Sequence, residues 1–104
     1  MAVYLSEGSW LPLEDFCENI GAIMHLPDFV YDGENVYQWG FVQIENGFVE
    51  INISCLNEPD PSVLVEYTLS LMVSKAAAPG LDKNWLEQNL LPPVEAALRL
   101  LRET

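Results

Sequence analysis

The residues of this 104-residue chain that could do chemistry are one histidine, two cysteines and sixteen carboxylates. His25 stands at the expected end of a helix, where a capping or structural role is typical. Cys17 and Cys55 lie too far apart for a disulfide framework or a metal knuckle, so we expect two buried, reduced thiols. The sequence contains no Gly-rich phosphate loop, nucleophile elbow or zinc-ligand spacing. It therefore predicts a protein that is not an enzyme and that uses no cofactor or metal.

The carboxylates are distributed unevenly and give the chain a net charge of −12. Residues 1–74 contain twelve of them and no Lys or Arg, whereas residues 75–104 hold four acids and four bases. Such a field attracts basic partners and speeds their encounter, while it disfavours nucleic acid and anionic lipid. We expect a basic protein partner, with simple solubility as the alternative explanation.

A hairpin over Val36–Cys55 is the strongest structural signal. Asn46-Gly47 favours a type I′ turn, which would place Glu45 opposite Phe48, Ile44 opposite Val49 and Gly40 opposite Ile53. Because side chains alternate along a strand, one face of the hairpin should belong to the core. The expected core face comprises Val36, Val42, Ile44, Val49, Ile51, Ile53 and Cys55. The expected outer face comprises Tyr37, Trp39, Phe41, Gln43, Glu45, Phe48, Glu50 and Asn52.

Other periodic segments complete the fold. Residues 12–26 have helical spacing, residues 63–73 alternate as a half-buried strand, and residues 2–5 suggest an edge strand. Asp82 is a plausible N-cap for a C-terminal helix. Pro92-Pro93 should break or kink that helix, because proline lacks an amide and disfavours helical geometry in the residue before it.

These elements predict an α+β fold in one domain over residues 1–104. We expect a two-layer sandwich, with an antiparallel sheet of three to five strands, an N-terminal helix and a kinked C-terminal helix. One sheet face would be left to solvent or to a partner. The chain has neither a run of apolar residues long enough for a membrane span nor a secretory signal, so a cytoplasmic location is expected.

The outer sheet face is the favoured binding site. Aromatic anchors inside an acidic rim suit an Arg- or Lys-rich protein surface, because apolar burial gives affinity and carboxylates give steering. The first-choice residues are Trp39, Phe41, Glu45, Glu50 and Glu66. Four loop acids, Asp32, Glu34, Glu58 and Asp60, are the second choice. If a helix or a second subunit covers the sheet, the site should move to these loops.

Short segments between residues 34 and 54 also resemble part of a known protein family. Glu34-Asn35, Tyr37-Gln38-Trp39 and Asn52-Ile53-Ser54 are similar to an element of small acidic bacterial immunity proteins, such as those of contact-dependent growth inhibition. The resemblance covers about a quarter of the chain, and Cys55 stands where such a motif would continue with a basic residue. It implies a protein that neutralises a toxin, often a basic nuclease, by steric and electrostatic blocking.

Two other functions compete with this hypothesis. A small acidic secretion chaperone would work as a homodimer that wraps an effector segment around apolar patches. An inhibitor that mimics nucleic acid would carry carboxylates at phosphate-like spacing. The sequence leaves open whether the chain is a monomer or a homodimer.

Overall fold

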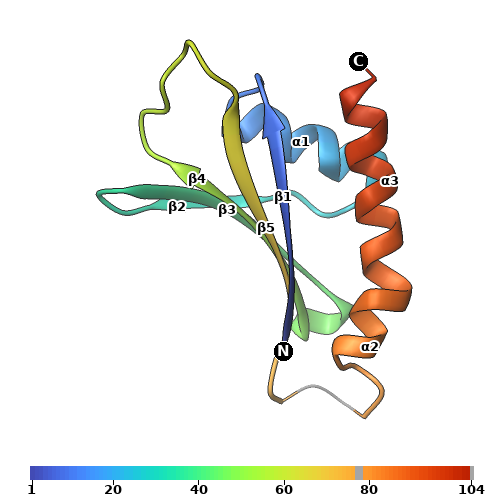
Figure 1. The fold of residues 1–104 in the computed structure, drawn as a ribbon. Coiled ribbons are helices and arrows are strands. Elements are labelled where there is room, and N and C mark those ends of the chain that lie inside the picture. The colour runs from blue at the N-terminus through green and yellow to red at the C-terminus, as the bar shows by residue number, and fades with distance from the viewer. Residues whose placement is uncertain (77–78, 104) are drawn as a thin grey trace.

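The computed structural model describes residues 1–76 and 79–103. Figure 1 shows a twisted sheet with all helices on one side of it, which confirms the expected α+β class and its two layers. The elements in chain order are β1 (Ala2–Ser9), α1 (Leu13–Met24), β2 (Val30–Gly33), β3 (Tyr37–Ile44), a short η1 turn (Glu45–Gly47), β4 (Val49–Leu56), β5 (Val65–Val73), α2 (Lys83–Trp85), η2 (Leu86–Leu90) and α3 (Leu91–Arg102).

The sheet has five antiparallel strands in the order β1-β5-β4-β3-β2. The predicted register of the central hairpin is confirmed, since Ile44 pairs with Val49 and Gly40 with Ile53. The expected edge strand at the N-terminus is confirmed and is longer than expected, reaching Ser9. The short β2 forms the other edge, and the β2–β3 hairpin projects beyond the helices (Figure 1).

The core lies between the sheet and the helices. Alternate residues of β4 and β5 are buried there, as the alternation predicted. The ring of Phe16 on α1 stacks on Tyr67 of β5, with centroids 4.2 Å apart. The Tyr67 hydroxyl donates to the Leu11 carbonyl oxygen at 2.6 Å, so the polar end of this buried ring has a partner.

Helix α1 follows the expected pattern. It starts after Pro12, carries Glu14 and Asp15 in its first turn, and buries Phe16 and Ile20. The acidic first turn interacts favourably with the helix dipole. The helix ends at His25, whose φ of 56° is left-handed and whose N–H reaches back to the last turn. His25 therefore occupies the expected C-terminal position.

The structure shows an irregular C-terminal helix without a break at Pro92-Pro93, so of the two expected outcomes, a break or a kink, only the break is wrong. The helical path runs from Lys83 to Arg102, with a π-helical turn over Leu86–Leu90 just before the prolines (Figure 1). Leu91 keeps helical angles, φ −56° and ψ −49°. A π turn widens the hydrogen-bond spacing, which accommodates residues without an amide inside one continuous segment. The Asp82 N-cap is confirmed, because its Oδ1 accepts from the Trp85 N–H at 2.9 Å.

Two details of the hairpin differ from expectation. The N–H of Phe48 donates to the Glu45 carbonyl at 3.1 Å around Asn46-Gly47, whose φ values of 57° and 86° are those of the expected turn. Glu45 is itself left-handed, with φ 51°, so the ladder closes at Ile44 and Val49 rather than at Glu45 and Phe48. Val36, expected in the core, is 56% exposed, because it lies in the turn between β2 and β3 and not on a strand that faces the helices.

Candidate partner-binding face

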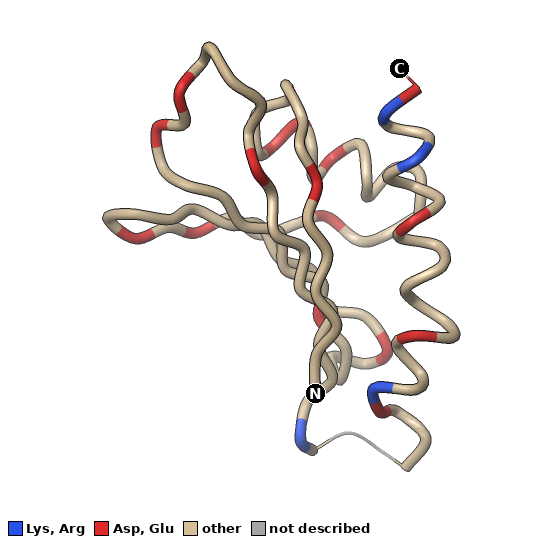
Figure 2. The backbone as a smooth tube through the Cα atoms, in the orientation of Figure 1, with Lys and Arg blue, Asp and Glu red and all other residues tan. Residues whose placement is uncertain are grey.

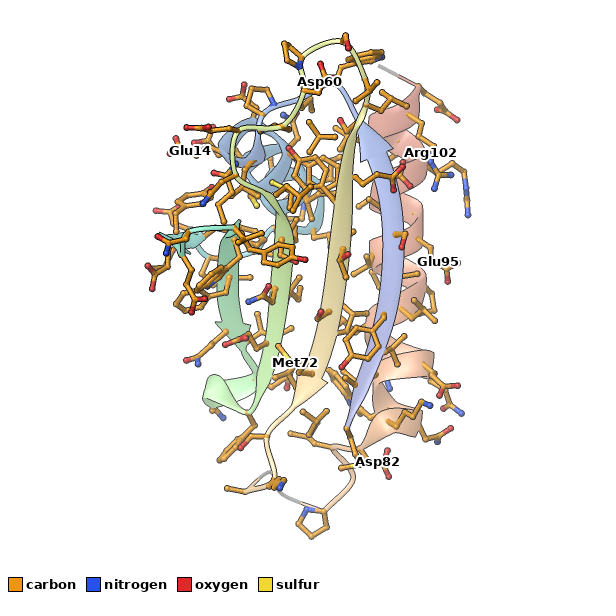
Figure 3. The ribbon with its side chains drawn as sticks, turned by 60° about the vertical axis from the view of Figure 1, so that its left-hand side comes forward. Glu14, Asp60, Met72, Asp82, Glu95 and Arg102 are labelled. Carbon is orange, nitrogen blue, oxygen red and sulfur yellow. The ribbon has the colours of Figure 1, made fainter. Side chains whose placement is uncertain are left out.

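The candidate site is the sheet face opposite the helices, which Figure 3 shows with its side chains and which we call the open face. Helices α1 and α3 both pack on the other side of the sheet (Figure 1). The face measures about 20 Å along the strands and about 20 Å across them, from the standard rise and spacing. Its residues are Ala2, Tyr4, Ser6 and Gly8 of β1, Glu66, Thr68, Ser70 and Met72 of β5, Glu50, Asn52, Ser54 and Leu56 of β4, Tyr37, Trp39, Phe41 and Gln43 of β3, and Val30 and Asp32 of β2.

An aromatic row runs along β3. Tyr37, Trp39 and Phe41 alternate on the open face; Tyr37 is 54% exposed, while Trp39 and Phe41 are half-buried. On the β4 side Trp39 and Phe41 have small polar neighbours, Ser54 and Asn52. Each of the two rings therefore keeps only part of its surface exposed for contact with a partner.

Three carboxylates lie on the open face together with this row. Asp32 lies directly beside Trp39 in the β2–β3 ladder. Glu50 is half-buried and sits between Gln43 and Met72 at one end of the face. Glu66 is exposed and lies opposite Gly8 at the other end. The face thus brings together Trp39, Phe41, Glu50 and Glu66 of the first-choice set with Asp32 of the second.

Glu45 does not belong to this face. The left-handed turn carries its side chain beyond the last ladder pair, where it is exposed. Positive φ at three successive residues turns the chain before a Glu45–Phe48 pair can form. The placement of Glu45 among the outer-face residues is therefore corrected.

The remaining acids lie in the loops at the rim. Glu34 stands at the tip of the β2–β3 hairpin, where its carbonyl accepts from the Asn57 side-chain amide. The Asn57 N–H also donates to the Val36 carbonyl at 2.8 Å, so the tip is tied to the end of β4. Glu58 is exposed in the β4–β5 loop and is left-handed, with φ 50°.

Asp60 organises its own loop. Its Oδ1 accepts from the Ser62 N–H at 2.9 Å and from the Ser62 hydroxyl at 2.7 Å. These hydrogen bonds hold the pKa of the Asp60 carboxyl below its usual value. Asp60 therefore stays charged near neutral pH, but part of its hydrogen-bonding capacity is already used.

Charge is segregated over the molecule, as Figure 2 shows. Acidic residues mark the β2–β3 tip and the β4–β5 loop, while the basic residues lie along the C-terminal helix and near the end of β5. Since residues 1–74 contain no Lys or Arg, the strands supply no positive charge to the open face. All charged side chains that the strands place on the open face are therefore negative.

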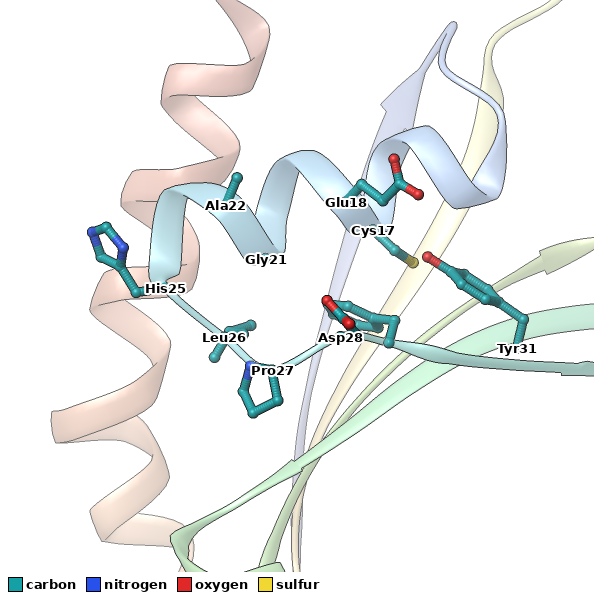
Figure 4. A pocket seen from close by; sticks show the side chains of 10 residues that line it. Cys17, Glu18, Gly21, Ala22, His25, Leu26, Pro27, Asp28 and Tyr31 are labelled. Carbon is teal, nitrogen blue, oxygen red and sulfur yellow. The ribbon is translucent and has the colours of Figure 1, made fainter.

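A cavity of about 430 Å³ lies beside the C-terminal half of α1. Figure 4 shows it between the helix and the segment that leads into β2, with Cys17, Glu18, His25, Asp28 and Tyr31 around it. Burial raises the pKa of the Cys17 thiol to about 12, so it remains protonated and a poor nucleophile. Both cysteines are buried and free, as expected.

Sequence reasoning missed this cavity and the close packing next to it. A Cβ added at Gly40 would lie 2.9 Å from Tyr31 Cε1 and 3.0 Å from Cys17 Sγ. The sequence signal that could have revealed this packing is Gly40, because a glycine in the middle of an apolar strand often marks a place where another group approaches the backbone closely.

Comparisons with protein-family models, with curated proteins and with solved structures gave no match. Within the described parts of the chain, no group of three or more His, Cys, Asp or Glu residues is arranged to hold a metal ion. No helix formed by those residues is long and apolar enough to cross a membrane.

Proposed function

We propose that this protein is an inhibitor of the immunity type, which binds and neutralises a basic protein toxin through the open face. The observation that supports the proposal is the row of Tyr37, Trp39 and Phe41 on the same sheet face as Asp32, Glu50 and Glu66, on strands that contain no Lys or Arg. Apolar rings next to carboxylates suit a surface that presents Arg and Lys.

The aromatic rings and the carboxylates of this surface would contribute to binding in different ways. An aromatic ring that is fully covered buries about 150–250 Å², and the half-buried Trp39 and Phe41 would bury the smaller portion that is still free. The carboxylates would steer a basic partner into the encounter and fix its register. Close charge pairs at such interfaces couple by about 1.5–7 kcal/mol.

The mechanism requires no catalytic group. A toxin whose active site binds an anionic substrate carries Lys and Arg around that site. The carboxylates of the open face would pair with these residues and exclude the substrate. A nuclease is the favoured class, because its substrate phosphates and this face carry the same sign of charge.

The test uses the C-terminal domain of a secreted protein encoded immediately upstream of this chain. Growth arrest by that domain should be relieved by the wild-type chain, and titration calorimetry should show binding that weakens as salt rises. The double variant Glu50→Lys, Glu66→Lys should bind at least about tenfold more weakly. Trp39→Ala should weaken binding with little change in its salt dependence.

The matched control is Glu87→Lys, Glu95→Lys, which makes the same change of charge on the helical side. It should bind nearly as well as the wild type. Equal losses in both double variants would mean that only net charge matters and would refute the site. Absence of any basic toxin domain in the neighbouring frame would count against the function itself.

A secretion chaperone is the second candidate. Tyr37 and Leu56 pair across β3 and β4, and each is 54% exposed, so the open face ends in an apolar pair that an effector segment could cover. A chaperone would bind an unfolded apolar peptide with weak salt dependence, whereas the immunity protein would bind a folded basic domain. Calorimetry with both ligands separates the two functions.

A further inference from the structure

Strand β1 is bonded on one side only, to β5, and forms a margin of the sheet (Figure 3). The Val73 N–H donates to the Met1 carbonyl at 3.1 Å, so the odd-numbered residues of β1 direct their backbone groups toward β5. Backbone groups alternate in direction along a strand, so Ala2, Tyr4 and Ser6 direct theirs outward. An exposed edge of this length is a template for another strand.

The apolar core is incomplete at this margin. Val3 and Leu5 point to the helical side and are only half-buried, whereas their partners on β5, Leu71 and Leu69, are fully buried. On the open face Tyr4 is 68% exposed. The strand contains no Lys and no Pro, the residues that commonly protect an edge against pairing.

The positive and negative charges near this margin balance, although the molecule as a whole is strongly acidic. Glu7 is the only charged residue of β1, and its two carboxylate oxygens accept from Arg102 at 2.6 and 2.7 Å. The adjacent helical segment, residues 83–102, holds Lys83, Arg99, Arg102, Glu87 and Glu95. Together with Glu7 this gives three positive and three negative charges, against −12 for the chain. Two copies would repel each other least here.

We infer that a second copy of this chain occupies the margin, and that β1 pairs antiparallel with β1 of the partner subunit. The backbone N–H and C=O groups that point outward belong to even-numbered residues in both copies, so even-numbered residues pair with even-numbered residues. Because the side chains of these residues lie on the open face in each copy, the two helical layers lie on the same side of the combined sheet. The two sheets then form one continuous sheet with a shared open face.

One register fits the side chains best. With Tyr4 opposite Tyr4 of the partner subunit, Val3 lies opposite Leu5 of the partner subunit on the helical side. The two aromatic rings meet on the open face, and the half-buried apolar residues complete each other's burial. If the strands are shifted by two residues, so that Tyr4 lies opposite Ser6 of the partner subunit, Val3 lies opposite Glu7 of the partner subunit.

This inference is independent of the proposed function, because it involves the edge of the sheet and not the binding of a toxin. It selects the homodimer from the two states that the sequence left open. The carboxylates Asp32, Glu50 and Glu66 of each copy would remain on the open face.

Sedimentation equilibrium tests the dimer. The wild-type chain should approach twice its mass of 11.7 kDa in the micromolar to millimolar range. Tyr4→Lys places a charge at the centre of the pairing and should weaken association at least about tenfold. Ser70→Lys is the control, because Ser70 lies beside Tyr4 on the same face but one strand inward, and it should remain dimeric. A monomer over the whole range, or a dimer lost with Ser70→Lys and kept with Tyr4→Lys, would overturn the inference.

A cross-link tests the register. Residues in a hydrogen-bonded antiparallel pair have Cα atoms about 5.5 Å apart, within the range that a disulfide spans. Oxidised Tyr4→Cys should therefore run as a covalent dimer on a non-reducing gel, and Ser70→Cys as a monomer. The native cysteines are buried and should not interfere. Equal cross-linking of both variants, or none with Tyr4→Cys, would refute this register. Neither result would alter the toxin-binding test, so the two proposals can fail separately.

Discussion

At the scale of single residues, the buried thiol of Cys17 and the partly buried phenol of Tyr31 couple stability to alkaline pH. Burial raises the pKa of Cys17 from 9.0 to about 12 and that of Tyr31 from 10.0 to about 12. Both groups are neutral in the fold and ionise more readily in the unfolded chain. The stability that they contribute is complete below their unfolded pKa and is lost as the pH rises toward about 12.

We therefore predict that the free energy of unfolding falls as the pH rises above 9.0, the unfolded pKa of Cys17. Cys17→Ala removes one ionising group and should flatten this fall, although the variant should be less stable at neutral pH because it leaves a cavity. Urea unfolding at several pH values gives both quantities. An unchanged slope in Cys17→Ala would contradict the assignment.

At the scale of elements, one ion pair joins the two ends of the chain. Glu7 on β1 is 8% exposed, and Arg102 in the last turn of α3 is 59% exposed. The two hydrogen bonds to one carboxylate make the pair bidentate, which fixes the geometry as well as the charge. The end of α3 is thereby held against the edge strand.

Removal of Arg102 leaves the buried Glu7 carboxylate without this partner, so Arg102→Ala should unfold at a lower urea concentration than the wild type. Arg99→Ala is the control, since Arg99 is exposed in the same last turn and contributes equally to the helix dipole. Hydrogen exchange should also become faster at the end of α3 in Arg102→Ala only. Equal shifts in the two variants would show that the ion pair contributes little.

At the scale of the whole molecule, charge acts on folding and on binding with opposite signs. The net charge of −12 makes the folded chain repel itself and repel its copies. The same charge attracts a basic partner. Salt shortens the range of both effects, from about 10 Å at 0.1 M to about 3 Å at 1 M.

Added potassium chloride should therefore raise the urea midpoint and strengthen the proposed homodimer, while it weakens the proposed binding of a basic toxin. A variant with Glu18, Glu34, Glu58 and Glu87 replaced by Gln has a smaller net charge and should show a smaller rise. The three effects can be measured by urea unfolding, sedimentation and calorimetry. A midpoint that falls with salt in the wild type would contradict this account of the charge.

The sequence by itself determined the features that depend on neighbours along the chain. The alternation along β4 and β5 defined the core face, and Asn46-Gly47 defined the hairpin register, because strand period and turn geometry are local properties. Glu50 and Glu66, with Trp39 and Phe41, could be assigned to one face by that periodicity alone.

Only the tertiary structure decided features that depend on where distant segments meet. It placed Glu7 against Arg102, exposed Val36 on the projecting hairpin and carried the C-terminal helix through its prolines. It also added Asp32 to the aromatic row, through a ladder that the sequence did not specify. The ion pair joins residues from opposite ends of the chain, and the other outcomes depend on how each element is placed in the fold; neither period nor propensity encodes them.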